Sequence, residues 1–115
     1  MYTAEDIARA IQLEDFEEAE ELLEEAVRRI LRRHNELGTE VECAWIRYCN
    51  NELCISVMLI PTVGMHPAVS INTLNEIANL LVDIGNMVYP GNPYDVCVTA
   101  GHYLLAVDYI IERAF

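Results

Sequence analysis

The sequence contains no lysine, and its seven basic residues, all arginine, stand against 19 acidic residues. The formal net charge of the 115-residue chain is therefore -12 at pH 7. A protein that binds nucleic acid needs a cationic surface to neutralise phosphates, so this composition argues against direct nucleic-acid binding. It leaves room for the opposite arrangement, in which an acidic chain imitates the charge of a nucleic acid and binds a basic protein.

Long apolar runs and signature motifs are also missing. No apolar run reaches the roughly 18 residues of a membrane-spanning helix, and the acidic first residues do not resemble a secretory signal. There is no GxGxxG, P-loop or HExxH motif. We therefore expect no membrane contact, no cofactor, no metal site and no enzymatic activity.

The cysteines do not follow the spacing of a metal site or a disulfide framework. They are Cys43, Cys49, Cys54 and Cys97. No two of them form a C-x-x-C pair, which is the usual element of a structural zinc site. Free thiols in a reducing cytoplasm are the expectation.

The charge divides the chain into two parts within a single expected domain, residues 1–115. Residues 1–40 hold 12 acids and 5 arginines, whereas residues 41–115 hold 7 acids and 2 arginines. The first part has helical periodicity and the second is apolar and rich in strand-forming residues. Hydrophobic residues make up 53% of the chain, enough for one buried core.

Three helices are predicted by capping residues and apolar spacing. Thr3 and Asp15 are N-cap candidates, and each is followed three residues later by an acid. From residue 16 to residue 37 the apolar positions recur with helical periodicity, and Gly38 is the expected stop. Ser70 is the expected N-cap of a further helix that ends near Val88.

Two β-hairpins account for the remainder. Residues 40–49 and 52–60 predict a hairpin with a type I′ turn at Asn50-Asn51, because asparagine tolerates positive φ. Residues 95–100 and 103–113 predict a second, with a two-residue type II′ turn at Gly101-His102. The last segment could also be a helix, but its Val, Ile and Tyr residues favour a strand.

These elements predict an α+β fold, a two-layer sandwich of order α-β-β-α-β-β after the short first helix. A four-stranded antiparallel sheet would carry the helices on one face. In the first hairpin the core face would hold Ala44, Ile46, Tyr48, Leu53, Ile55, Val57 and Leu59. The opposite, mixed face would hold Val41, Cys43, Trp45, Arg47, Cys49, Cys54, Ser56, Met58 and Ile60.

The long helix carries eight acids within twelve residues. Its expected partner-binding acidic face consists of Glu14, Glu17, Glu18, Glu21, Glu24 and Glu25. One charge per ~2.3 Å of helix approaches the one per ~1.7 Å of duplex DNA. The alternative is an ordinary solvated face, since acids at a helix start favour its dipole and Glu24 and Glu25 can pair with arginines four residues on.

The mixed sheet face is the second candidate interface. Its members of most interest are Val41, Trp45, Arg47, Met58 and Ile60. An exposed apolar patch with Trp, Met and Arg is typical of a protein interface, so a homodimer or another protein partner is expected there. The alternative is that part of the chain covers this face. An open sheet edge could also join two copies strand to strand.

The leading hypothesis is a non-enzymatic acidic protein-binding module, in its sharper form an inhibitor that occupies a basic nucleic-acid-binding surface. Phage-encoded antagonists of bacterial defence, anti-CRISPR proteins included, are similar in size and charge. A second hypothesis is an acidic homodimeric chaperone or adaptor, similar in size and charge to type III secretion chaperones. A third is a small thiol enzyme, in which Arg47 lowers the pKa of Cys54 or Cys49.

Overall fold

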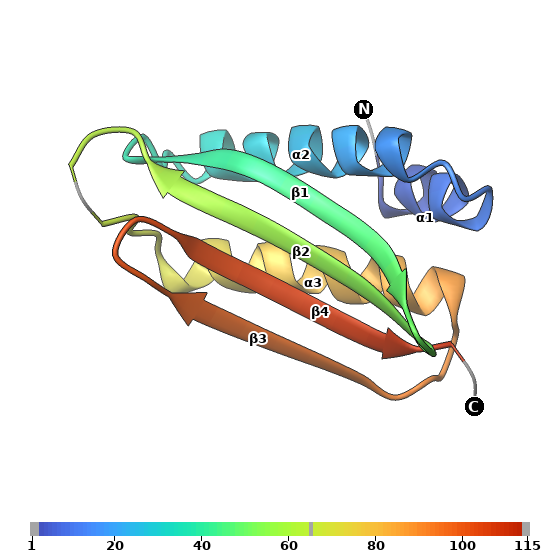
Figure 1. The fold of residues 1–115 in the computed structure, drawn as a ribbon. Coiled ribbons are helices and arrows are strands. Elements are labelled where there is room, and N and C mark those ends of the chain that lie inside the picture. Colours follow the sequence, from blue (N-terminus) through green and yellow to red (C-terminus); the bar gives the residue numbers. More distant parts are fainter. Residues whose placement is uncertain (1–2, 65, 114–115) are drawn as a thin grey trace.

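The computed structural model of the protein describes residues 3–64 and 66–113. Its elements are α1 (Ala4–Gln12), α2 (Phe16–Arg33), β1 (Thr39–Cys49), β2 (Glu52–Pro61), α3 (Ile71–Val88), β3 (Tyr94–Ala100) and β4 (Leu105–Glu112). The strands form one antiparallel sheet of order β1-β2-β4-β3, with the helices on one side of it (Figure 1). The predicted α+β two-layer fold is confirmed.

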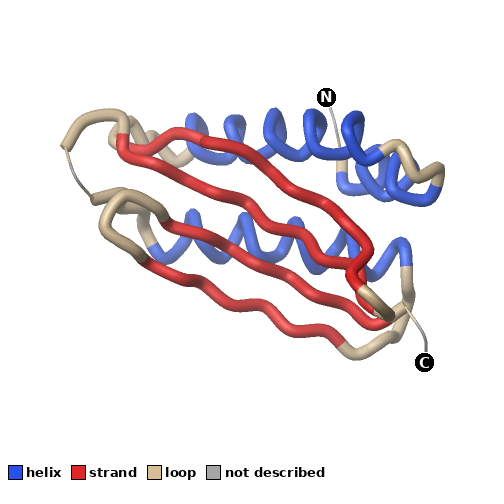
Figure 2. Tube along the Cα trace, in the orientation of Figure 1, coloured by secondary structure: helices blue, strands red, loops and turns tan. Residues whose placement is uncertain are grey.

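Each helix covers a different part of the molecule. Helix α2 packs against β1 and α3 packs against β4, whereas α1 lies across one end and contacts both longer helices. Figure 2 shows the helices behind the sheet, with β3 at the uncovered margin. None of the described helices is both long and apolar enough to cross a membrane.

Side chains at the helix starts bond to the backbone as their spacing predicts. The Thr3 N–H donates to Asp6 Oδ2 at 3.1 Å, and the Glu18 N–H donates to Asp15 Oδ1 at 3.3 Å. At the start of α3 the Ser70 hydroxyl accepts the N–H of Thr73 at 3.2 Å. These bonds satisfy N–H groups that have no partner within the helix.

Helix α2 ends earlier than predicted. Its last residue is Arg33, and Asn35 has a φ of 56°, in the left-handed region. Asparagine adopts this conformation more readily than most residues, so it ends the helix before Gly38. The prediction that Gly38 is the stop was therefore wrong.

The first hairpin has the predicted register but a different turn. Cys49 pairs with Glu52, and Ala44 pairs with Val57. A type I′ turn needs positive φ at both central residues, but of Asn50 and Asn51 only Asn50 has one, at 57°. Positive φ at the first central position alone is the type II′ pattern.

A β-bulge in β1 changes the face of one predicted interface residue. Val41 pairs with Leu59 and Cys43 pairs with Met58, so Glu42 is an extra residue without a partner. The bulge turns Val41 towards the helices, where it is only 9% exposed. The placement of Val41 on the outer face was wrong, because strict alternation does not anticipate a bulge.

The second hairpin confirms the strand in the final segment and corrects the turn. Ala100 pairs with Leu105, and the Gly101 N–H donates to the Leu104 carbonyl at 2.7 Å. The connection therefore spans four residues, 101–104, in place of the predicted two-residue turn at Gly101-His102.

Gly85 in α3 allows the helix to lie close to the sheet. An added Cβ at this position would overlap the ring of Tyr109 in β4, a side chain that is completely buried. The Tyr109 hydroxyl has no hydrogen-bond partner among the described residues, and burial raises its pKa to about 12. Because the ring has no room to move aside, this contact sets the spacing between α3 and the sheet.

We expect Gly85→Ala to lower the free energy of unfolding by about 1 kcal/mol, measured by urea denaturation. The overlap costs about 1–3 kcal/mol and outweighs the ~1 kcal/mol by which alanine favours a helix. Gly38→Ala is the matched control, since a Cβ there would have no atom within 4 Å. Equal stability of Gly85→Ala and wild type would show that Tyr109 does not lie against α3.

Candidate protein-binding surface

The sheet face opposite the helices is open. We call it the open sheet face; no described helix or strand packs on it (Figure 1). One row of neighbouring residues across it consists of Trp45, Ser56, Asp108 and Cys97, in strand order. Trp45 remains 38% exposed and Ile110, in the next row, 37%. The predicted interface residues Trp45, Arg47, Met58 and Ile60 therefore lie on one face, without Val41.

Acidic side chains are interspersed with the apolar residues of the open sheet face. By strand alternation this face carries Glu40, Glu52, Asp95, Asp108 and Glu112. The cation among its described residues is Arg47, whose guanidinium lies 5.7 Å from the centre of the Trp45 ring. Arg47 also forms an ion pair with Glu20, so it offsets little of the negative charge. The face therefore combines apolar side chains, among them Trp45 on the edge strand β1, with carboxylates at its ends and at Asp108 on the inner strand β4.

Two glutamates of α2 bond to the edge of the sheet. The Ile46 N–H donates to Glu20 Oε2 at 2.8 Å, and the Ala44 N–H donates to Glu24 Oε2 at 3.4 Å. Both N–H groups belong to β1, an edge strand whose outward backbone groups have no neighbouring strand. Glu20 and Glu24 therefore act as partners for an otherwise open strand edge.

The predicted acidic helix face divides into two groups. Glu24 and Glu25 pair with arginines one turn or more along the helix, at distances of 3.3 to 3.9 Å. The other predicted members are exposed and form no ion pair with a described residue. These are Glu14, Glu17, Glu18 and Glu21. Within this helix face, the unpaired negative charge is thus concentrated at the start of α2.

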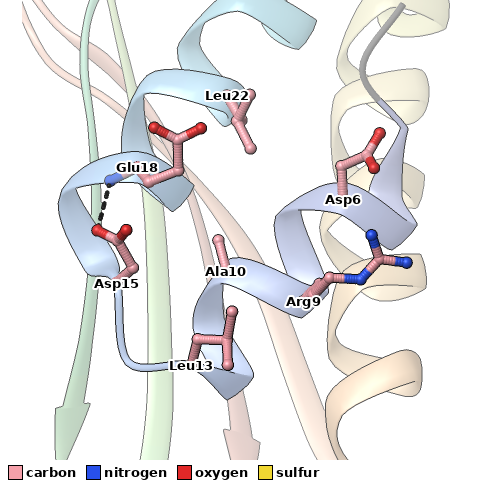
Figure 3. Close-up of a pocket in the computed structure, with 7 residues that line it drawn as sticks. All are labelled: Asp6, Arg9, Ala10, Leu13, Asp15, Glu18 and Leu22. Carbon is pink, nitrogen blue, oxygen red and sulfur yellow. Dashed lines mark hydrogen bonds between the residues drawn. The ribbon is translucent and has the colours of Figure 1, made fainter.

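A shallow groove lies at the corner between α1 and α2, beside these unpaired acids (Figure 3). Its lining residues are Asp6, Arg9, Ala10, Leu13, Asp15, Glu18 and Leu22. Arg9 forms an exposed ion pair with Glu5 at 3.7 Å. Three carboxylates above an apolar floor could accept a cationic side chain of a partner. The sequence did not indicate this groove, because it forms only where α1 folds back on α2.

Two thiols of the first hairpin, Cys54 and Cys43, are poorly suited to nucleophilic chemistry. Burial and a hydrogen bond to Cys49 raise the pKa of Cys54 to about 11. Arg47 lies opposite Cys54, but its charge is shared with Glu20. Burial also raises the pKa of Cys43, as does the negative charge of Glu42. No group of three potential metal ligands occurs among the described residues.

The histidines lie apart from these thiols. His34, at the end of α2, hydrogen-bonds Glu76 of α3 at 3.2 Å. His66 and His102 lie in the loops at one end of the sheet, with their ring centres 5.5 Å apart. They belong to loops that connect elements, and none of the three is on the open sheet face.

No protein-family model, curated protein or solved structure matches the chain.

We expect Glu20→Ala to lower the free energy of unfolding by about 1–3 kcal/mol, because the buried-edge N–H of Ile46 loses a charged acceptor. Urea denaturation provides the measurement. Glu21→Ala is the matched control; its exposed side chain makes no ion pair with a described residue, so its effect should stay within about 0.5 kcal/mol. Equal effects of the two substitutions would contradict the edge-bonding role of Glu20.

We expect Cys54 to react with iodoacetamide more slowly than free cysteine near pH 7, since its pKa is raised to about 11 and only the thiolate is nucleophilic. A variant that keeps Cys54 and replaces the other cysteines by serine isolates the rate. The rate should rise about tenfold per pH unit below the pKa, and unfolding in urea should restore the rate of free cysteine. Alkylation of the native variant faster than free cysteine at pH 7 would contradict this prediction and support the thiol-enzyme hypothesis.

Proposed function

We propose that this protein is a non-enzymatic protein-binding module that binds a basic partner protein through its open sheet face. The observation that carries the proposal is the exposed Trp45 on strand β1 of the uncovered sheet face. Large aromatic residues in such positions contribute a large share of binding energy at protein interfaces. Exposed apolar side chains next to polar ones are typical of a contact surface.

The chemistry of the partner follows from the carboxylates of the open sheet face. These carboxylates would face a partner surface rich in arginine or lysine; they are Glu40, Glu52, Asp95, Asp108 and Glu112. The net charge of -12 would also increase the association rate with such a partner. The partner surface should therefore combine apolar and cationic side chains.

In a sharper form of the proposal, that cationic surface is one that otherwise holds nucleic acid, and this protein inhibits it by occupation. The support is the run of unpaired carboxylates at the start of α2, beside the acidic groove of Figure 3. These carboxylates offer a second acidic surface that could extend along a basic channel. Competition with nucleic acid for the partner is the distinguishing property.

The two alternative hypotheses gain less support from the geometry. The secretion-chaperone hypothesis needs a stable dimer and fits the open sheet face equally, but it does not account for the unpaired acids of α2. The thiol-enzyme hypothesis needs a depressed thiol pKa, and the pKa of Cys54 is raised to about 11.

The test is affinity capture at low salt from a lysate of the source organism, followed by binding measurements on the purified partner. We expect binding to weaken strongly between 0.1 M and 1 M salt, where the Debye length falls from ~10 to ~3 Å. Trp45 is the single tryptophan of the chain, so binding should shift its fluorescence to shorter wavelength and protect it from acrylamide.

Trp45→Ala should weaken binding by about 2 kcal/mol or more, the range of an interface hot spot. Asn79→Ala, at an exposed position of α3 on the opposite side, is the matched control and should bind as wild type does. A partner whose binding neither depends on salt nor changes the Trp45 fluorescence would contradict the proposal. For the sharper form, nucleic acid that binds the partner alongside this protein would be the contradicting result.

A further inference from the structure

The two edges of the sheet differ in their protection. At the β1 edge, α2 supplies Glu20 and Glu24 as acceptors, and the bulge at Glu42 interrupts the strand. At the β3 edge, no described strand lies beyond β3 and no helix packs against it. Soluble proteins usually protect edges with charge, proline, bulges or covering elements. Of the two edges, the β3 edge is therefore the one available to pair with another strand.

The backbone groups that β3 turns outward are identified by its bonds to β4. The Glu112 N–H donates to the Pro93 carbonyl at 3.1 Å, and the Gly101 N–H donates to the Leu104 carbonyl at 2.7 Å. In an antiparallel pair, hydrogen-bonded residues alternate with residues that turn their N–H and C=O groups away. The odd-numbered residues of β3 therefore bond to β4. The outward residues are Tyr94, Val96, Val98 and Ala100.

These four residues also form an apolar line on the helix-facing side. Tyr94 is 50% exposed and Val98 46%, because the helices pack on β1 and β4 and stop short of β3. The strand contains no proline, arginine or lysine, and its single charged residue is Asp95. A regular, apolar strand with free N–H and C=O groups is a template for another strand.

We propose that β3 pairs with β3 of a second copy of this chain, antiparallel and centred on Cys97. In this register Val96 bonds to Val98 of the partner subunit, and Tyr94 bonds to Ala100 of the partner subunit. The two-fold axis repeats both pairs with the two subunits exchanged. All the outward groups of the strand are then paired. The two sheets become one continuous eight-stranded sheet, with the helices of both copies on the same side.

A second copy of β3 is the favoured partner for this edge, because under a two-fold axis the strand is complementary to itself. Asp95 would lie opposite Thr99 of the partner subunit, so no like charges meet directly. The exposed Tyr94 and Val98 would be flanked by apolar side chains of the second copy. Centring on Cys97 pairs the whole of β3, Tyr94–Ala100, whereas a shift in either direction leaves one end of it unpaired.

Dimer formation through β3 does not depend on the proposed function, and the two should respond to salt in opposite directions. Each copy carries a net charge of -12, so mutual repulsion opposes dimer formation and salt should strengthen the dimer. Binding of a basic partner to the open sheet face should weaken with salt. The dimer also leaves that face open and doubles its extent.

The test uses disulfide cross-linking together with sedimentation equilibrium. In the proposed register Cys97 faces its own counterpart in a non-hydrogen-bonded pair, with Cα atoms ~4.5 Å apart, within disulfide range. A variant that keeps Cys97 and replaces the other cysteines by serine should form covalent dimers under oxygen with copper–phenanthroline. Each bond joins two thiols, and the two protons and two electrons released pass to oxygen. A variant that keeps only Cys43, near the opposite edge, should not cross-link.

Val96→Pro removes an outward N–H without removing a bond to β4, and it should give a folded monomer that cross-links at least tenfold more slowly. Val98→Pro provides the same test at the second outward position if the first variant does not fold; circular dichroism checks both. We expect wild type to sediment with twice the chain mass, increasingly so at 0.5 M salt. A monomer at all concentrations and salts, or equal cross-linking in a folded proline variant, would overturn the proposal.

Discussion

The carboxylate of Glu20 connects the acidic helix to the sheet, and the arrangement of the molecule's surfaces depends on this connection. It accepts the N–H of Ile46 at the edge of β1 and pairs with Arg47 on the next residue. One edge of the sheet is thereby closed by α2. With α2 over β1 and α3 over β4, the helices all lie on one side, and the opposite sheet face and the β3 edge remain open.

The net charge of the chain divides into parts with different roles. Glu20 and Glu24 bond to the backbone of β1, and Glu25 pairs with arginines of its own helix. The unpaired acids lie at the start of α2 and on the open sheet face. Helix α2 therefore carries both glutamates that stabilise the fold and glutamates that are available to a partner.

Periodicity and capping predicted most of the fold, because each helix and strand has one buried face and an alternation of matching period. The first hairpin register follows from the length of its turn. The errors lie at local backbone choices. Asn35 ends α2 before Gly38. The bulge at Glu42 places the Val41 side chain on the helix-facing side of the sheet. The second hairpin has a four-residue connection in place of a two-residue turn. Small conformational energies decide such features, and the residue pattern does not record them.

The sequence by itself determined the helices and strands, the antiparallel two-layer arrangement and the presence of Trp45, Arg47, Met58 and Ile60 on one face of a hairpin. These depend on the alternation of apolar and polar residues, which is a local property. Only the tertiary structure decided which glutamates of α2 are used by the sheet, where the groove beside Leu13 forms, and which sheet edge stays open. Those features depend on contacts between residues far apart in the chain, where helix and strand meet.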